Sequence, residues 1–333
     1  MIVERPHRSA ARLSVAAGLA SLALSCGAAI AQAPPYPSQR VLIVVGFPPG
    51  GPADIAARAM AEGLQSRLGK PIIVENRPGG GGSAAASAVA RAEPDGHTLL
   101  AAGEGPISIV PALAVPSYSA MAGLTTISVF AEGGCTVVAV TPSFAAKDLK
   151  GLIAEAKAAK EPVTYASSGL GTPSDTVAAE FAQAAGIELK RVIYRGAAPA
   201  LSDLIAGHVP LMFPTAGQTT ELIAAGKLRG LAVSTKSRCK VLPDVPTLTE
   251  AGIPLEAGKI WFGLFAPSAL PAAIAEFLFK ETQAVSSTPE LSKRIEAITL
   301  EPVRHTKREA SAEYVAKDVA DWQRKAATIP GLK

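Results

Sequence analysis

Three segments of this sequence could bind an anion. At each one a run of β-branched residues ends in Gly, Pro or Ser, and a helical pattern follows directly: Phe47–Asp54, Ser167–Pro173 and Tyr194–Ala198. The first-turn N–H groups of a helix have no partner inside it and carry partial positive charge. Such a junction can therefore hold a carboxylate or a phosphate. Any one junction alone also fits an ordinary turn built by glycine and proline.

The candidate ligand-binding residues are the backbone donors, hydroxyls and charged side chains of these three junctions. They are Phe47, Pro49, Gly50, Gly51, Asp54, Ser167, Ser168, Gly169, Thr172, Asp175, Tyr194 and Arg195. Their hydroxyl groups would add neutral hydrogen-bond donors to the backbone amides. Arg195 is the one cation beside a predicted ligand loop, and a surface ion pair is favoured for it over a ligand contact.

Asp54 and Asp175 both fall in the first turn of a predicted helix, and two interpretations remain open. Each carboxylate can stabilise its own helix N-terminus without meeting a ligand, which is the favoured interpretation. Alternatively, both face the ligand and repel a second negative charge. In that case we expect a monocarboxylate that carries an amine or an amide.

Residues for catalysis or metal binding are scarce. After the N-terminal segment only His97, His208 and His305 remain, and none has metal-ligand spacing to a second His or Cys. Gly-x-Ser-x-Gly, His-Glu-x-x-His, Cys-x-x-Cys and the phosphate-loop motif are absent from the sequence. We therefore predict no catalytic residue, no metal, no cofactor and no enzymatic activity. The alternative is a cryptic exported α/β hydrolase or isomerase, with His208 as its base.

Short apolar runs alternate with helical periods, which predicts an α/β fold. Pro52 and Pro173 suit first helical positions, and Gly69 is a helix-ending glycine. Thr306 and Glu309 have the spacing of a capping box and predict the start of a C-terminal helix. The predicted strands are Val41–Val45, Ile72–Glu75, Thr98–Ala102, Ile127–Ala131, Thr136–Val140, Val163–Ala166, Arg191–Tyr194, Val209–Phe213, Leu228–Ser234 and Ile260–Phe265.

Residues 1–31 have the pattern of a secretory signal peptide. A basic start, an apolar stretch over Leu13–Leu24 and the small residues Ala29-Ile30-Ala31 predict cleavage near Ala31. A lipid anchor at Cys26 is the less favoured alternative, because Ala23 stands where such a signal usually has Leu. The expected location is the periplasm.

Composition and charge are those of a globular protein with no nucleic-acid partner. The 333 residues are 48% hydrophobic and 18% charged, and the net charge of +4 falls to +2 without the three Arg and one Glu of residues 1–31. No basic stripe of the kind that binds nucleic acid is present. Of the cysteines outside the signal, Cys135 and Cys239 could pair in an exported protein. Two unpaired thiols are the favoured interpretation.

Seven ordered motifs resemble the Bug-type (Bordetella uptake gene) solute receptors of tripartite tricarboxylate transporters. The resemblance runs from about Tyr36 to the C-terminus. The motifs are Phe47-Pro48-Pro49-Gly50-Gly51 with Asp54, Ala57 and Arg58; Val74–Gly79; Pro94–Leu100; Tyr165–Gly169; Tyr194–Leu201; Leu242–Thr247; and Trp261 with Gly263 and Leu264.

The resemblance implies a two-domain periplasmic-binding-protein fold, a type II-like clamshell with mixed sheets flanked by helices. It implies chain crossings near Gly133 and Ser234, hence a discontinuous domain 1 (32–133 plus 235–333) and a domain 2 (134–234). The implied function is the capture of a small carboxylate or amino-acid-like ligand between the domains. Membrane permease subunits of the transporter would receive the ligand from a receptor that we expect to be a monomer.

The same fold could instead serve as a ligand sensor for a signalling partner. The sequence departs from the usual pattern of the family in three places: Ser174-Asp175-Thr176 stands where relatives often have Ser-His-Leu, Ile193 where they often have proline, and Pro210 where they usually have aspartate. These differences leave the expected fold unchanged and leave the identity of the ligand open.

Overall fold

The computed structural model describes residues 1–2, 36–113 and 120–329. The predicted cleavage site at Ala31 and the cysteine Cys26 lie outside the described residues. The chain divides into two units, and the second, Gln39–Lys333, is the one described below. The second unit contains both sheets and the candidate site.

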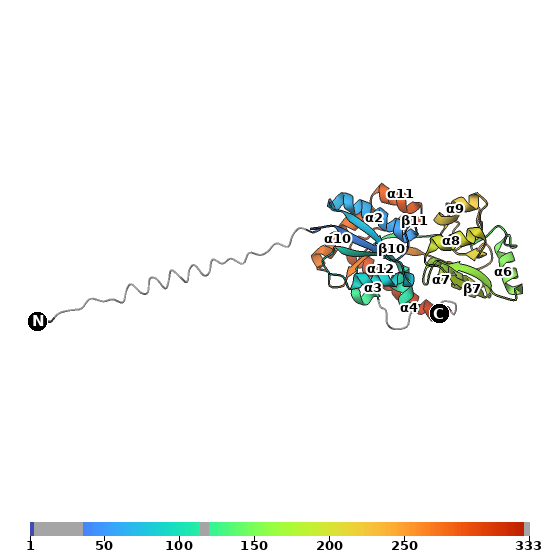
Figure 1. Cartoon of the computed structure of the whole chain (residues 1–333), viewed down its shortest axis with the longest axis horizontal. Helices are drawn as coiled ribbons and strands as arrows, with labels where there is room; N and C mark the ends of the chain where they lie inside the picture. Colours follow the sequence, from blue (N-terminus) through green and yellow to red (C-terminus); the bar gives the residue numbers. More distant parts are fainter. Residues whose placement is uncertain (3–35, 114–119, 330–333) are drawn as a thin grey trace. The chain divides into compact units, whose positions relative to one another are not determined.

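The first sheet has six strands in the order β11-β4-β10-β3-β1-β2. Figure 1 labels two of them, β10 and β11. Strand β1 pairs in parallel with β2 and β3, whereas β10 runs antiparallel to β3 and β4, and β11 antiparallel to β4. The central strands are almost fully buried, as expected for a sheet covered by helices on both faces. The strands are β1 (Val41–Val45), β2 (Ile72–Asn76), β3 (Thr98–Gly103), β4 (Leu124–Gly133), β10 (Ile260–Pro267) and β11 (Leu300–Pro302).

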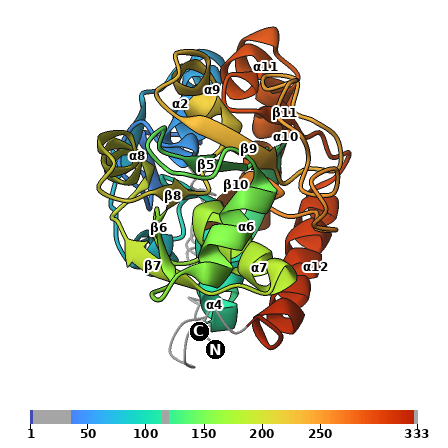
Figure 2. The same cartoon turned by 90° about the vertical axis from the view of Figure 1, so that its right-hand side faces the viewer.

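The second sheet has five strands in the order β7-β6-β8-β5-β9 (Figure 2). Strand β6 is parallel to β7 and β8, and β5 is antiparallel to β8 and β9. The strands are β5 (Val137–Val140), β6 (Val163–Ser167), β7 (Leu189–Ile193), β8 (Leu211–Met212) and β9 (Arg229–Val233). All of its strands come from one continuous stretch of sequence, whereas the first sheet takes strands from either side of that stretch.

Helices cover both sheets and bury their apolar stripes against them. Around the first sheet lie α2 (Pro52–Leu68), α3 (Ser83–Ala90), α10 (Ala272–Ser286), α11 (Pro289–Glu296) and α12 (Arg308–Ala326), with the short elements η1 (Gly80–Gly82), η2 (Gly105–Ile109), α4 (Val110–Leu113) and α5 (Ala120–Gly123). Around the second sheet lie α6 (Leu149–Ala158), α7 (Pro173–Ala185), α8 (Ala197–Ala206) and α9 (Ala216–Ala224). One core cluster joins α6 and α7 to this sheet, and another joins α8 to its opposite face.

All ten predicted strands are present, with ends shifted by a few residues. The predicted helix starts at Pro52 and Pro173 and the helix end at Gly69 are confirmed. The predicted capping box at the last helix is wrong, because α12 begins at Arg308 with Lys307 as an N-cap that makes no side-chain bond. The short strand β11 was not predicted; it forms because β4 offers it an edge to pair with.

The favoured expectation of two unpaired thiols is also wrong. Cys135 and Cys239 form a disulfide, with Cα atoms 6.4 Å apart and 104 residues of separation. One cysteine precedes β5 and the other follows β9, which are neighbouring strands. Sequence spacing alone could not reveal this, because only strand pairing brings the two sulfurs together. None of the helices in the described residues combines the length and the hydropathy needed to span a bilayer.

Candidate functional site

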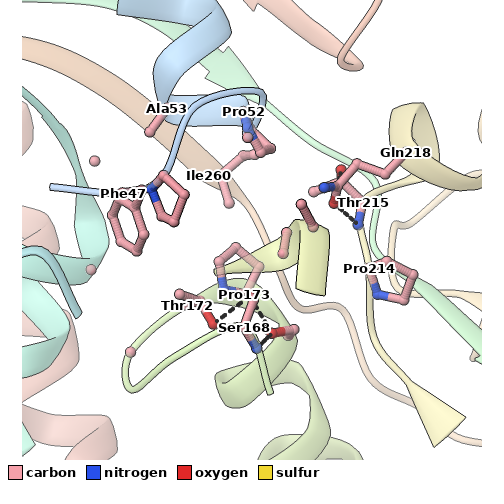
Figure 3. A pocket seen from close by; sticks show the side chains of 18 of the residues that line it. Phe47, Pro52, Ala53, Ser168, Thr172, Pro173, Pro214, Thr215, Gln218 and Ile260 are labelled. Atoms are coloured by element: carbon pink, nitrogen blue, oxygen red, sulfur yellow. Dashed lines mark hydrogen bonds between the residues drawn. The ribbon is translucent and has the colours of Figure 1, made fainter. Parts of the chain in front are cut away.

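Four helices begin at the rim of one cavity (Figure 3). They are α2, α7, α8 and α9, and each follows a strand whose carboxyl end faces the same space, the usual ligand position in open α/β sheets. The lining residues are Phe47, Pro48, Pro49, Gly51, Pro52, Ala53, Gly103, Glu104, Gly105, Pro106, Ser168, Gly171, Thr172, Pro173, Ser174, Ala197, Ala198, Met212, Phe213, Pro214, Thr215, Gln218, Ile260 and Phe262. Most of these side chains are apolar, so the polar recognition falls on backbone amides and a few hydroxyls.

The loop before α2 is held in place by Asp54. Its carboxylate accepts the Gly50 N–H at 2.9 Å, Arg58 Nε at 3.0 Å and Asn76 Nδ2 at 2.8 Å. Burial raises the pKa of Asp54, but hydrogen bonds from Arg58, Gly50 and Asn76 outweigh burial, so the net pKa is lowered. Asp54 is therefore ionised and turned into its own loop.

Asp175 holds the loop before α7 in place in the same way, and it is more deeply buried than Asp54. It is fully buried and accepts the Gly171 N–H at 3.2 Å, the Tyr165 hydroxyl at 3.2 Å and Arg191 Nη1 at 3.1 Å. Arg191 comes from the neighbouring strand β7. Asp175 thus has a full set of partners, and its charge is balanced by a cation from another element.

Three hydroxyls form a bonded triangle at the start of α7. Ser168 Oγ lies 3.0 Å from Thr172 Oγ1 and 2.6 Å from Ser174 Oγ, and the last two atoms are 3.1 Å apart. The Ser174 hydroxyl also accepts the Ser168 N–H at 2.8 Å. Because hydroxyls both donate and accept, this triangle can reorient to offer an O–H to a ligand acceptor.

A capping box opens α9 on the far side of the cavity. Thr215 N–H donates to Gln218 Oε1 at 3.3 Å, and the Thr215 hydroxyl accepts in return from the backbone of the helix. Since Oε1 is already engaged, Gln218 can offer a ligand its amide NH₂ group. Figure 3 shows these two residues facing the α2 and α7 loops across the cavity.

Glu104 lies at the carboxyl end of β3 and is 5% exposed. Its Oε2 accepts the Trp261 N–H at 3.1 Å. Burial raises the pKa of Glu104, the backbone N–H groups of Glu104 and Trp261 lower it, and the Asp318 carboxyl raises it, to about 8 overall. A carboxyl with that pKa is mostly protonated at neutral pH.

A second hollow adjoins the first and is lined by Gly46, Phe47, Pro48, Pro78, Gly79, Gly80, Gly81, Ser168, Gly169, Leu170, Ile193, Tyr194 and Arg195. The Tyr194 hydroxyl donates to Asp203 Oδ2 at 2.6 Å. The Gly-rich element η1 lies close to the loop before α7 here, since a Cβ on Gly81 would lie 2.3 Å from the Leu170 carbonyl oxygen. Backbone therefore packs on backbone between η1 and the α7 loop.

The structure brings eight of the twelve predicted site residues to these two hollows. Phe47, Pro49, Gly51, Ser168 and Thr172 line the first, and Gly169, Tyr194 and Arg195 line the second. Gly50, Asp54, Ser167 and Asp175 line neither and instead form the loops from behind. Asp54 and Asp175 thus occupy the position that the first interpretation of them described, although neither is the N-cap residue of its helix.

Glu104, Ser174, Thr215 and Gln218 line the first cavity but were not among the predicted site residues. Two signals could have found some of them. Thr215 and Gln218 have the Thr-x-x-Gln spacing of a capping box just after a predicted strand. Glu104 follows the predicted strand Thr98–Ala102, at the end of the strand where α/β sheets bind ligands.

The described residues contain no cluster of three or more His, Cys, Asp or Glu suited to a metal ion. His208 lies outside both hollows, is 72% exposed in its side chain and contacts Asp203 at 3.3 Å. The geometry is that of a binding cavity with anion-stabilising helix ends.

Comparison with known proteins assigns the chain to a family. A family model described as tripartite tricarboxylate transporter family receptor matches residues 56–329. The chain belongs to this receptor family. Protein BugT of Bordetella pertussis is similar, at 31% identity over 299 residues that cover 89% of this chain and 90% of BugT. An Agrobacterium vitis protein from the TAR-I ttuE-ttuC' intergenic region is 33% identical over 268 residues, covering 80% and 77%.

Solved receptor structures share the fold. The periplasmic binding protein BugD has a TM-score of 0.79 at 31% identity, covering 88% of this chain and 99% of BugD. The R. palustris protein Rpa4515 with adipate scores 0.82 at 30% identity, covering 89% and 98%. MatC of Rhodopseudomonas palustris with bound malate scores 0.81 at 27% identity, covering 87% and 100%.

This chain, as a member of the receptor family, therefore has the two-domain α/β fold of periplasmic binding proteins. The resemblance read from the seven motifs is confirmed. Family and structural relatives are solute-binding receptors and not enzymes, which excludes the hydrolase and isomerase alternative. Receptors of this family are periplasmic, in agreement with the compartment expected from the sequence.

Proposed function

We propose that this protein captures a small organic carboxylate with an apolar body in the cavity between the two sheets. One observation carries the proposal: four helix N-termini surround a cavity, and the described residues that line it include no Lys or Arg. Helix ends and backbone amides stabilise an anion without a cation. The related structures with adipate and with malate support a carboxylate as the ligand class.

The apolar lining narrows the expected ligand. Phe47, Phe213, Ile260 and Phe262 border the cavity together with six prolines and Met212. An aliphatic or aromatic chain between polar ends would bury against these side chains, at about 25 cal/mol per Å² of apolar surface. A ligand rich in hydroxyls would leave its donors without partners there.

The proposed domains are 32–133 plus 235–333 and 134–234, with residues 1–31 as a signal peptide. Support comes from the sheets, because β4 ends at Gly133 and β9 ends at Val233, next to the two proposed crossings. The domains would close on the ligand by hinge motion. The closed receptor would deliver it to the permease subunits of a tripartite tricarboxylate transporter in the periplasm, as a monomer.

A thermal-shift screen of residues 32–333 tests the function directly. A ligand present at 100 times its Kd adds about 2.7 kcal/mol and moves the melting temperature by a few degrees. We expect a selective shift by one class among aliphatic dicarboxylates, aromatic acids, hydroxy acids and amino acids. A shift by sugars or cations alone, with every carboxylate inert, would contradict the proposal.

Ser168→Ala provides the matched site variant, because its hydroxyl belongs to the bonded triangle and its side chain lines both hollows. Ser202→Ala is the control, since its hydroxyl bonds only to the Ala198 carbonyl of its own helix and is exposed. We expect weaker binding for the first variant and unchanged binding for the second.

A further inference from the structure

The charge of the cavity depends on one side chain. Among the described residues that line it, Glu104 is the only ionisable one, and the remainder are apolar or neutral. A carboxylate ligand would meet helix ends on several sides and the Glu104 carboxyl on another. An ionised Glu104 would repel that ligand across a poorly solvated space.

The hydrogen bonding of Glu104 fixes where a proton would be. Its Oε2 accepts the Trp261 N–H at 3.1 Å, so that oxygen is occupied as an acceptor. A protonated carboxyl carries one O–H, and Oε1 is the oxygen that does not accept the Trp261 N–H. Glu104 is 5% exposed and is one of the residues that line the cavity, which places it beside a ligand bound there.

The surroundings of Glu104 favour its neutral form. Strand β10 presents the Trp261 amide, and α12 presents the Asp318 carboxyl and the Tyr314 phenol. Burial is the largest effect and raises the pKa to about 8, with Asp318 adding to the increase. Asp318 is half-buried, and desolvation raises its own pKa, whereas hydrogen bonds from Ser108 and Trp261 and the charge of Lys325 act in the opposite sense.

We propose that Glu104 takes part in ligand binding as a neutral acid, donating its Oε1–H to a carboxylate oxygen of the ligand and coupling binding to proton uptake. The inference rests on the proposed function, because it requires a carboxylate in this cavity. At most one proton is taken up per ligand; it comes from solvent and remains on Glu104, and no covalent bond to the ligand forms.

The sign of the pH dependence follows from the charges. A bound carboxylate raises the pKa of Glu104 further, so affinity is fully present below the pKa of the free receptor and falls above it. With a free-state pKa of about 8, affinity for adipate should fall about tenfold between pH 7 and pH 9. The compound 6-aminohexanoate replaces one carboxylate with an ammonium, and its binding should be weaker at pH 7.

Isothermal titration of the mature chain with adipate and with malate from pH 6 to pH 9 provides the test. The wild type should lose affinity about tenfold from pH 7 to 9 and take up protons at pH 8, seen as a dependence of heat on buffer. Glu104→Gln keeps the shape and the acceptor for Trp261, and should bind with no loss between pH 7 and 9. Glu250→Gln is the control; Glu250 is an exposed carboxylate paired with Arg238 outside the cavity, and its variant should behave as the wild type.

A second readout needs no ligand. In protein labelled with ¹³C at the glutamate side-chain carboxyls, one resonance should titrate near pH 8, and that resonance should be absent in Glu104→Gln. Titration of that carboxyl near its ordinary value of 4.5 would overturn the inference whatever the ligand.

The outcomes separate the two proposals. Equal affinity at pH 7 and 9 in the wild type would overturn the role of Glu104 and leave the carboxylate receptor intact. Tighter binding of 6-aminohexanoate than of adipate, lost in Glu104→Gln, would show an ionised Glu104 that pairs with a ligand ammonium. Failure of every carboxylate to bind at every pH would overturn the proposed function itself.

Discussion

The loops before α2 and α7 have the same design but differ in how far they depend on the rest of the fold. In each, an aspartate at the third helical position accepts a backbone N–H from a glycine four residues earlier, Gly50 or Gly171. The balancing cation of Asp54 is Arg58, one turn along the same helix and about half exposed. The cation of Asp175 is Arg191, which arrives from a neighbouring strand.

The difference shows that one acidic residue type can fix a loop locally or through tertiary contacts. Both aspartates are paired with a cation and neither lines a hollow, which agrees with the interpretation that each stabilises its own loop. The helix ends at the cavity can still stabilise an anion, because the two carboxylates are paired with arginines behind the loops. The α2 loop should therefore tolerate disruption better than the α7 loop.

Removal of the disulfide should give the largest loss of stability, and this loss should be confined to the second sheet. Replacing Cys135 and Cys239 together with serine removes a crosslink across a loop of about 100 residues and should cost about 4 kcal/mol of unfolding free energy. Urea unfolding measures the loss, and hydrogen exchange should show faster opening in β5–β9 than in β1–β3. Two titratable thiols in the denatured, non-reduced wild type would contradict the pairing.

Asp175→Asn tests the loop before α7, which depends on the tertiary contact with Arg191. It leaves the partly buried Arg191 without its counter-charge and should cost about 3 kcal/mol, measured by urea unfolding. Asp203→Asn is the matched control from α8, which covers the same sheet, since the Asp203 side chain is 39% exposed and its partners Tyr194 and His208 lie near the surface. A loss under 1 kcal/mol for Asp175→Asn would mean that the buried pair contributes no more than an exposed one.

Gly217→Ala extends the comparison to the first turn of α9. A Cβ there would lie 2.7 Å from the Ala297 carbonyl oxygen at the end of α11, which packs against α2 beside the first sheet. Overpacking should cost about 1–3 kcal/mol and appear mainly as lost affinity in titration calorimetry, because opening the two halves relieves it. Gly63→Ala is the control: its clash is with Val285 within the first-sheet half, and it should lower stability more than affinity. If Gly217→Ala lowered stability more than affinity, the parts of the molecule built on the two sheets would not move apart.

Asp54→Asn should have the smallest effect, about 1 kcal/mol, because Arg58 stays solvated without it. The pKa of Asp54 is lowered in the folded protein, so its contribution is present above the unfolded value of 3.8 and is lost as pH falls through the folded value. Acid unfolding curves of variant and wild type should therefore converge at low pH. Curves that stay parallel below pH 3.8 would exclude Asp54 as the cause.

Local signals predicted the elements better than they predicted the cavity. Pro52, Pro173 and Gly69 fixed helix ends because proline and glycine restrict or free the backbone within a residue or two. The pair Thr306 and Glu309 had equally good spacing and failed, since α12 begins two residues after Thr306 with Lys307 as its N-cap. Thr215 and Gln218 form a real capping box that was overlooked.

The amino-acid sequence by itself determined the alternation of strands and helices, the three junctions that border the two hollows, and the membership of the receptor family. These depend on backbone preferences and on residues adjacent in the chain. Tertiary structure decided the rest: the Cys135–Cys239 bond, the Arg191 partner of Asp175 and the placement of Glu104 in the cavity. Each of these depends on strand order and burial, which bring together residues that no local pattern connects, and burial together with the Asp318 carboxyl raises the pKa of Glu104.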